Sequence, residues 1–205
     1  MEMPVAKSLE MVREGVLTWQ AFSPHHKVEL TSSAIVVNGD LYAFDPIPLT
    51  EDLLVSLEAN GHPKAVILTN ENHLRGSEDL ARRWKVPIFV SDAASLDGAA
   101  ANRIRSGLGR FDGFQMIRLE GGAGGELAFI QPQKRVLILG DALFNLPGHG
   151  FDILPERYCT DRRQLISNLR ELLNLDFDLL VMAHGEAIAS DPAGRIRELL
   201  ARVAS

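Results

Sequence analysis

The stretch that decides the fold is AVILTNENHLRGSEDLARRW, residues 65–84. It begins as an apolar run, continues as a mostly polar cluster after Leu68, and ends in a helical pattern. A strand that ends in polar side chains just before a helix holds those side chains rigidly at one sheet edge, which is how preorganised sites are built. The metal-ligand types in the cluster are Glu71 and His73, and a cation, Arg75, stands close to both. The cluster therefore predicts a site that either binds a metal or has replaced one with side chains.

Strands and helices alternate on both sides of this stretch. The segment TSSAIVVNGDLYAFDP predicts two strands joined by a tight turn at Asn38-Gly39. Thr50 is the expected cap of a helix over about residues 51–59, and Ser77 is the expected cap of the next helix. VPIFVS is a further strand. This strand–helix alternation favours mixed α/β layers.

The second half of the chain has a different pattern of apolar segments. The runs FQMIRLE, ELAFIQ and RVLILGD are separated by short turns and predict a β-meander. Apolar residues then recur at helical spacing in residues 159–176, and FDLLVMAHGE is another buried strand. The last predicted helix has Asp191 as its cap and Pro192 at its first position. We expect one domain over residues 1–205.

Composition limits the function. The formal net charge is −6, which argues against a nucleic-acid partner. No apolar stretch is long enough to span a membrane, and the first residues lack the apolar region of a secretory signal. A single cysteine, Cys159, excludes an internal disulfide and fits a packing role in a reducing compartment. We therefore expect a cytoplasmic protein with no membrane partner.

Four apolar segments end in polar tips: Asp45, the cluster after Thr69, Asp141 and His184. In their chain order these segments resemble the metallo-β-lactamase fold superfamily between about Ser32 and Ile188. The matching pieces are YAFDPIPL, VILTNENHLRGSEDLARRW, LEGGAGGELAFI, RVLILGDALF and DLLVMAHGEAI. The resemblance implies an α+β fold, a four-layer αββα sandwich of two mixed β-sheets flanked by helices, with a metal cleft along one edge.

The loop departs from the family pattern, which reads Thr-His-x-His-x-Asp-His. The two histidines fall on Asn70 and Asn72, the aspartate on Leu74 and the next histidine on Arg75. A further histidine of the first metal falls on Gly122. The resemblance thus implies that the usual two-metal site is degenerate and that a dinuclear zinc site does not form.

Two second-metal ligands remain, Asp141 and His184. The pattern Thr-Asn-x-x-His-x-Arg also resembles a smaller branch of the superfamily without an established substrate. Two functions stay open at this point.

The first is a hydrolase with one divalent metal, zinc, iron or manganese. Its ligands would be Asp141, His184 and His73, and a metal-bound water would be the nucleophile. His73 would alternatively carry protons, and Arg75 would orient an anionic substrate. Further candidate ligands are Glu71, Glu126 and His149.

The second is a catalytically silent protein that has no metal. It would bind a small molecule or a protein through the cleft that holds the metals in other superfamily members. In this case Arg75 pairs with Asp141 and replaces the metal, since a guanidinium forms bidentate pairs with carboxylates. The glycine-rich turn GGAGGE is expected to be a flexible tight turn rather than a phosphate-binding loop. A homodimer is compatible with the sequence.

Overall fold

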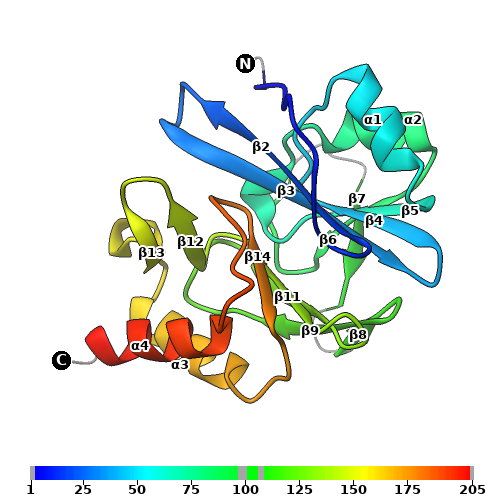
Figure 1. Cartoon of the computed structure of the whole chain (residues 1–205). Coiled ribbons are helices and arrows are strands. Elements are labelled where there is room, and N and C mark those ends of the chain that lie inside the picture. Colours follow the sequence, from blue (N-terminus) through cyan, green and yellow to red (C-terminus); the bar gives the residue numbers. More distant parts are fainter. Residues whose placement is uncertain (1–2, 97–100, 106–108, 204–205) are drawn as a thin grey trace.

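The computed structural model describes residues 3–96, 101–105 and 109–203. Within them, two β-sheets lie face to face and α-helices cover the outer face of each, as Figure 1 shows. The predicted α+β fold, a four-layer αββα sandwich with mixed sheets, is confirmed.

The first sheet has seven strands, ordered as in the chain. They are β1 (Glu10–Arg13), β2 (Val16–Ser23), β3 (Val28–Val37), β4 (Asp40–Phe44), β5 (His62–Ile67), β6 (Ile88–Ser91) and β7 (Ala101–Ile104). Strands β1 to β4 pair antiparallel, and β4 to β7 pair parallel. The parallel part is linked by α1 (Glu51–Glu58) and α2 (Ser77–Trp84), which lie together on the outer side of this sheet (Figure 1).

The second sheet has five strands in the order β14-β11-β10-β9-β8. They are β8 (Arg110–Phe111), β9 (Phe114–Arg118), β10 (Leu127–Gln131), β11 (Val136–Leu139) and β14 (Leu179–Met182). The predicted meander is β9 to β11, and β14 pairs parallel to β11. Helices α3 (Arg162–Leu172) and α4 (Pro192–Arg202) cover the outer side. A separate hairpin is formed by β12 (Leu143–Leu146) and β13 (Gly150–Ile153).

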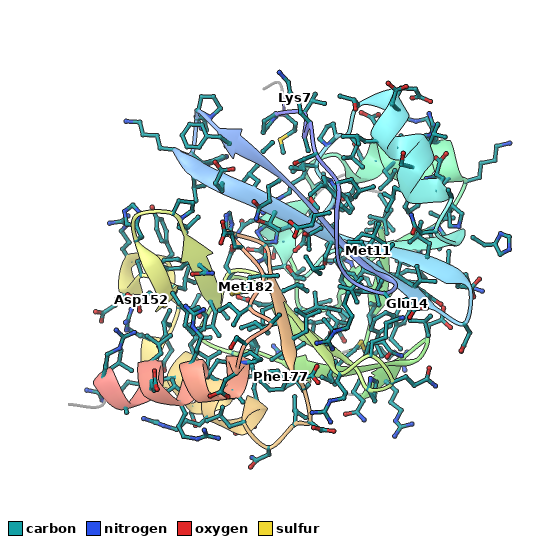
Figure 2. All side chains as sticks on the ribbon, viewed as in Figure 1. Lys7, Met11, Glu14, Asp152, Phe177 and Met182 are labelled. Atoms are coloured by element: carbon teal, nitrogen blue, oxygen red, sulfur yellow. The ribbon has the colours of Figure 1, made fainter. Side chains whose placement is uncertain are left out.

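The core lies in three layers, one between the two sheets and one between each sheet and its helices. Between the sheets, the ring of Phe44 packs edge-on against Phe114 and Phe129, with centroids 5.4 and 5.2 Å away. Separate apolar clusters fill the spaces between each sheet and its helices, where Figure 2 shows densely packed side chains. Two-sided burial explains why β11, VLIL, reads as an unbroken apolar run.

Most predicted boundaries agree with the structure. The turn at Asn38-Gly39 joins β3 and β4, and Asp191 caps α4 by accepting a hydrogen bond from the backbone N–H of Gly194. The prediction that Ser77 caps α2 is wrong, because Ser77 is already its first helical residue. Strands β1 and β2 and the hairpin β12–β13 were not predicted. In the described part of the chain no helix has both the length and the apolar character needed to cross a membrane.

Candidate metal centre

The site begins where β4 and β5 end. These strands are parallel neighbours, so the residues that follow them, Asp45 and Thr69, emerge at the same sheet edge. The carboxylate of Asp45 is 3% exposed and accepts hydrogen bonds from the backbone N–H of Thr69 (2.8 Å to Oδ1) and its hydroxyl (2.6 Å to Oδ2). Asp45 has a φ of +48°, a conformation that costs about 1–3 kcal/mol and often occurs at functional sites. The loop is thus anchored to the neighbouring strand before it reaches the site.

A single 3₁₀ turn, Glu71–His73, then points His73 inward. The Nδ1 atom of His73 lies 3.0 Å from Asp45 Oδ2 and 3.0 Å from Thr69 Oγ1. Its Nε2 atom lies 3.1 Å from Oδ1 of Asp141. The imidazole, 3% exposed, therefore bridges a carboxylate of the first sheet and one that follows the second.

Asp141 and His184 come from the second sheet. They follow β11 and β14, which are parallel neighbours and end side by side; Figure 2 labels Met182, the last residue of β14. His184 Nε2 lies 3.1 Å from Asp141 Oδ1, and His184 Nδ1 lies 3.0 Å from the carbonyl oxygen of Glu29. Ligand atoms of His73, Asp141 and His184 all lie within 4.8 Å of one another.

The hydrogen-bond partners of the two imidazoles favour a cation at this cluster. A ring nitrogen facing a carbonyl oxygen must carry a hydrogen, and a neutral imidazole has only one N–H. In neutral His184, Nδ1–H donates to Glu29, so Nε2 presents a lone pair to the carboxylate of Asp141. Neutral His73 faces a carboxylate oxygen at both ring nitrogens, so either tautomer leaves one lone pair against Asp45 or Asp141. Either a second proton on each ring or a metal ion between the rings and Asp141 resolves this repulsion.

The donor set fits a metal ion. Zinc bonds to imidazole and carboxylate are about 2.0–2.1 Å, so two ligand atoms of a tetrahedral site lie about 3.3 Å apart. Asp141 Oδ1 is 3.1 Å from each of the two Nε2 atoms. A ligand histidine that donates its other N–H to a carboxylate or a carbonyl is typical of metal centres. His73 and His184 both have such a partner.

The same contacts shift the pKa values of the buried groups. Burial lowers the pKa of His73, but the carboxylates of Asp141 and Asp45 outweigh burial and raise it to about 9. Burial raises the pKa of Asp141, but the charges and hydrogen bonds of His73 and His184 hold it well below the usual value. Burial likewise raises the pKa of Asp45, and the charge of His73 reverses this effect. Without a metal, His73 is thus an imidazolium at neutral pH.

A family model described as the Metallo-beta-lactamase superfamily matches residues 6–203. The chain belongs to this superfamily. A search of curated proteins gave no match.

Several solved structures share this superfamily fold. DIM-1 metallo-beta-lactamase exposed to ceftazidime has a TM-score of 0.76 and 13% identity, with 100% of both chains covered. A metallo-beta-lactamase from Erythrobacter litoralis has a TM-score of 0.74 and 11% identity, with 95% of this chain and 96% of the other covered. TTHA1623 in a di-iron-bound form has a TM-score of 0.65 and 20% identity, covering 86% of this chain and 95% of its own. At these identities the likeness shows the fold.

Arg75, at the position of a superfamily histidine, does not pair with the carboxylate of Asp141 in the described structure, so that prediction is wrong. Its Nη1 donates to the carbonyl oxygens of Thr31 (2.8 Å) and Asp45 (3.1 Å), and Nη2 donates to that of Ala183 (3.2 Å). Both oxygens of Asp141 already face other side chains. Arg75, at φ +41°, instead ties the strand ends of the two sheets together.

The further candidate ligands lie outside the cluster. Glu71 Oε2 accepts the backbone N–H of Ser95 (2.6 Å), and His149 is exposed in the turn between β12 and β13. Glu126 is 1% exposed, and its Oε1 accepts the backbone N–H of Ala142 (2.8 Å). Burial and the nearby charge of Asp141 raise the pKa of Glu126 to about 8. Glu126 therefore supports the strand end that carries Asp141.

The glycine-rich turn is packed rather than loose, contrary to the expectation of flexibility. A Cβ atom at Gly125 would lie 2.6 Å from Ala94, and one at Gly124 would lie 2.2 Å from the carboxylate of Glu71. At Gly122, the superfamily histidine position, it would lie 2.8 Å from Oε2 of Glu126. Gly125 is thus required by the backbone of Ala94 and its φ of +66°, whereas at Gly122 and Gly124 the neighbours are glutamate carboxylates, and Glu126 lies in the space next to the lost ligand.

Proposed function

We propose that this superfamily member is a metal-dependent hydrolase that binds one divalent ion, zinc, iron or manganese, through His73, Asp141 and His184. One observation carries the proposal: two histidines, each oriented through Nδ1, direct Nε2 at the same carboxylate oxygen. Iron is included because TTHA1623, a structurally similar protein, was solved in a di-iron-bound form. We also propose a cytoplasmic location, since a lone cysteine fits a reducing compartment.

The residues around the centre have separate tasks. A bound ion would supply a water activated near neutral pH. Three protein ligands leave one position open for it, which is typical of catalytic rather than structural sites. Asp45 and Thr69 hold His73 in the tautomer that presents Nε2 to the ion, and the Glu29 carbonyl does the same for His184. These contacts would hold both imidazoles in place while substrate binds and leaves.

A second function is supported by a different observation. His73 has a pKa of about 9 and contacts two carboxylates, so an imidazolium neutralises them in the absence of a metal. The chain would then be a catalytically silent binding protein. In this alternative the cation that replaces the metal is His73 rather than Arg75.

Metal content separates the two functions. The protein would be purified without a histidine tag, stripped with a chelator, reloaded with zinc, iron or manganese, and analysed by elemental mass spectrometry. We expect about one ion per chain in the wild type, and loss of that ion in Asp141→Ala and His184→Ala. His149→Ala, an exposed histidine outside the cluster, is the matched control and should retain the ion.

The outcome directs the next assay. One ion per chain justifies a screen of esters, lactones and phosphodiesters, with the same three variants as controls. No ion above the level of the Asp141→Ala variant would favour the silent binding protein, and ligand screening would then replace turnover assays.

A further inference from the structure

The two oxygens of Asp141 face different groups. Oδ1 lies 3.1 Å from Nε2 of both histidines of the cluster. Oδ2 accepts a hydrogen bond from the side-chain amide of Asn70, with Nδ2 3.0 Å away. Asn70 has no exposed surface, so this hydrogen bond is shielded from water.

The orientation of the Asn70 amide is fixed from its other end. Its Oδ1 accepts the backbone N–H of Asn72 at 2.9 Å, which starts the 3₁₀ turn that carries His73. Flipping the amide would place NH₂ against this N–H and a carbonyl oxygen against the Asp141 carboxylate. The Asn70 donor is therefore committed to Asp141.

Packing fixes the position of the amide as well. A Cβ atom at Gly140 would lie 3.0 Å from Nδ2 of Asn70 and 2.5 Å from Oγ1 of Thr69. The amide thus lies against the bare backbone that immediately precedes Asp141. Contact on this side and the two hydrogen bonds leave Asn70 little freedom to move away.

We propose that Asn70 is a positioning residue that makes Asp141 a one-oxygen ligand and limits the centre to one ion. The inference rests on the proposed function, since it concerns how the same centre holds its metal. Two-oxygen binding of one ion, or a carboxylate bridge to a second ion, would draw on Oδ2 of Asp141, and the Asn70 amide already donates to that oxygen. Asn70 stands at the position of a first-metal histidine of the superfamily, so a hydrogen bond takes the place of a metal–ligand bond.

The decisive variant is Asn70→Ser. Serine can still accept the N–H that starts the 3₁₀ turn, as serine does at helix N-termini, but its side chain is too short to reach Asp141. Asn72→Ser is the matched control, because Asn72 is exposed and contributes its backbone N–H to the network. Zinc affinity would be measured by competition with a chromophoric chelator, and zinc stoichiometry by titration with excess metal. The visible spectrum of the cobalt-substituted protein would report coordination.

We expect one ion in the wild type even with excess zinc. Asn70→Ser should bind it about 10–100-fold more weakly, as for other residues that orient metal ligands. Its cobalt spectrum should change because Oδ2 becomes available, and Asn72→Ser should match the wild type. Two ions in the wild type, or an Asn70→Ser variant with unchanged affinity and spectrum, would overturn the inference.

The two proposals fail in different ways. No ion in the wild type overturns the metal centre and the Asn70 role together, whereas one ion with an unchanged Asn70→Ser variant overturns the Asn70 role alone. If Asn70→Ser does not fold, the wild-type stoichiometry in excess zinc still decides, because a second ion contradicts the inference.

Discussion

Raising the pH should destabilise the metal-free protein through His73. The folded-state pKa of His73 is raised from 6.5 to about 9 by Asp141 and Asp45. Below pH 6.5 the proton is bound in both the folded and the unfolded chain, and the stabilisation is fully present. Between pH 6.5 and 9 the unfolded chain loses the proton first, so stability falls as the pH rises, and the contribution is lost above pH 9.

The magnitude follows from the difference between the two pKa values. About 2.5 pH units at about 1.4 kcal/mol per unit correspond to about 3.5 kcal/mol in total, of which about 3 kcal/mol is lost between pH 6.5 and pH 9.5. The assay is urea denaturation of chelator-treated protein at pH 6.5 and pH 9.5, the wild type beside His73→Gln. Because the pKa of Glu126 is raised to about 8, this group also makes the folded protein less stable as the pH rises. The difference between the two proteins therefore reports His73 together with its charge interaction with Glu126.

We expect the wild type to lose about 3 kcal/mol more than His73→Gln over this pH range. Equal losses in the two proteins would refute the reasoning that His73 bridges Asp45 and Asp141 as an imidazolium. In the presence of zinc the stability of the wild type should instead rise with pH, since metal binding requires a deprotonated Nε2 and becomes stronger as the pH rises.

Three further substitutions test other contacts. Asp45→Asn should weaken zinc binding by about 10–100-fold in a chelator competition, because it removes the carboxylate that orients a ligand histidine. Arg75→Met should lower the free energy of unfolding by about 3 kcal/mol or more in urea, since three carbonyl oxygens lose a charged donor; exposed Arg82→Met should change little. Gly140→Ala should lower both zinc affinity and the melting temperature, because the new Cβ atom would lie 2.5 Å from a hydroxyl oxygen of the site; an unchanged affinity would show that the loop shifts freely.

The layers could be predicted because the sequence marks strands buried on both faces so clearly. The runs that became β10, β11 and β14 are buried throughout, and such strands read as unbroken apolar stretches. Strand β2, VLTWQAFS, mixes polar and apolar residues, and β12 is only partly buried, so neither has a regular pattern. Each of them pairs with the next strand along the chain, β2 with β3 and β12 with β13, and this pairing rather than an apolar pattern sets its place in the fold.

The candidate site could be predicted only in part. Asp141 and His184 lie at the ends of apolar strands, so their place at a sheet edge follows from the pattern. The direction of His73 depends on one 3₁₀ turn, and shifting that turn by one residue would point the imidazole elsewhere. The Arg75 prediction was wrong because the positions of backbone carbonyl oxygens from three separate segments leave no trace in the sequence. The hydrogen bond between Asn70 and Asp141 could not be predicted either, since an amide at a ligand position does not indicate which carboxylate it will contact.

The centre joins two halves of the molecule. His73 is held against the first sheet, whereas Asp141 and His184 follow strands of the second. A bound ion would therefore cross-link the two sheets. At a free concentration 100 times its Kd, it would add about 2.7 kcal/mol to the free energy of unfolding. The affinity for the ion would in turn depend on the packing between the sheets. A substitution that loosens the packing between the sheets far from the centre, for example Phe129→Leu, should therefore weaken binding of the ion.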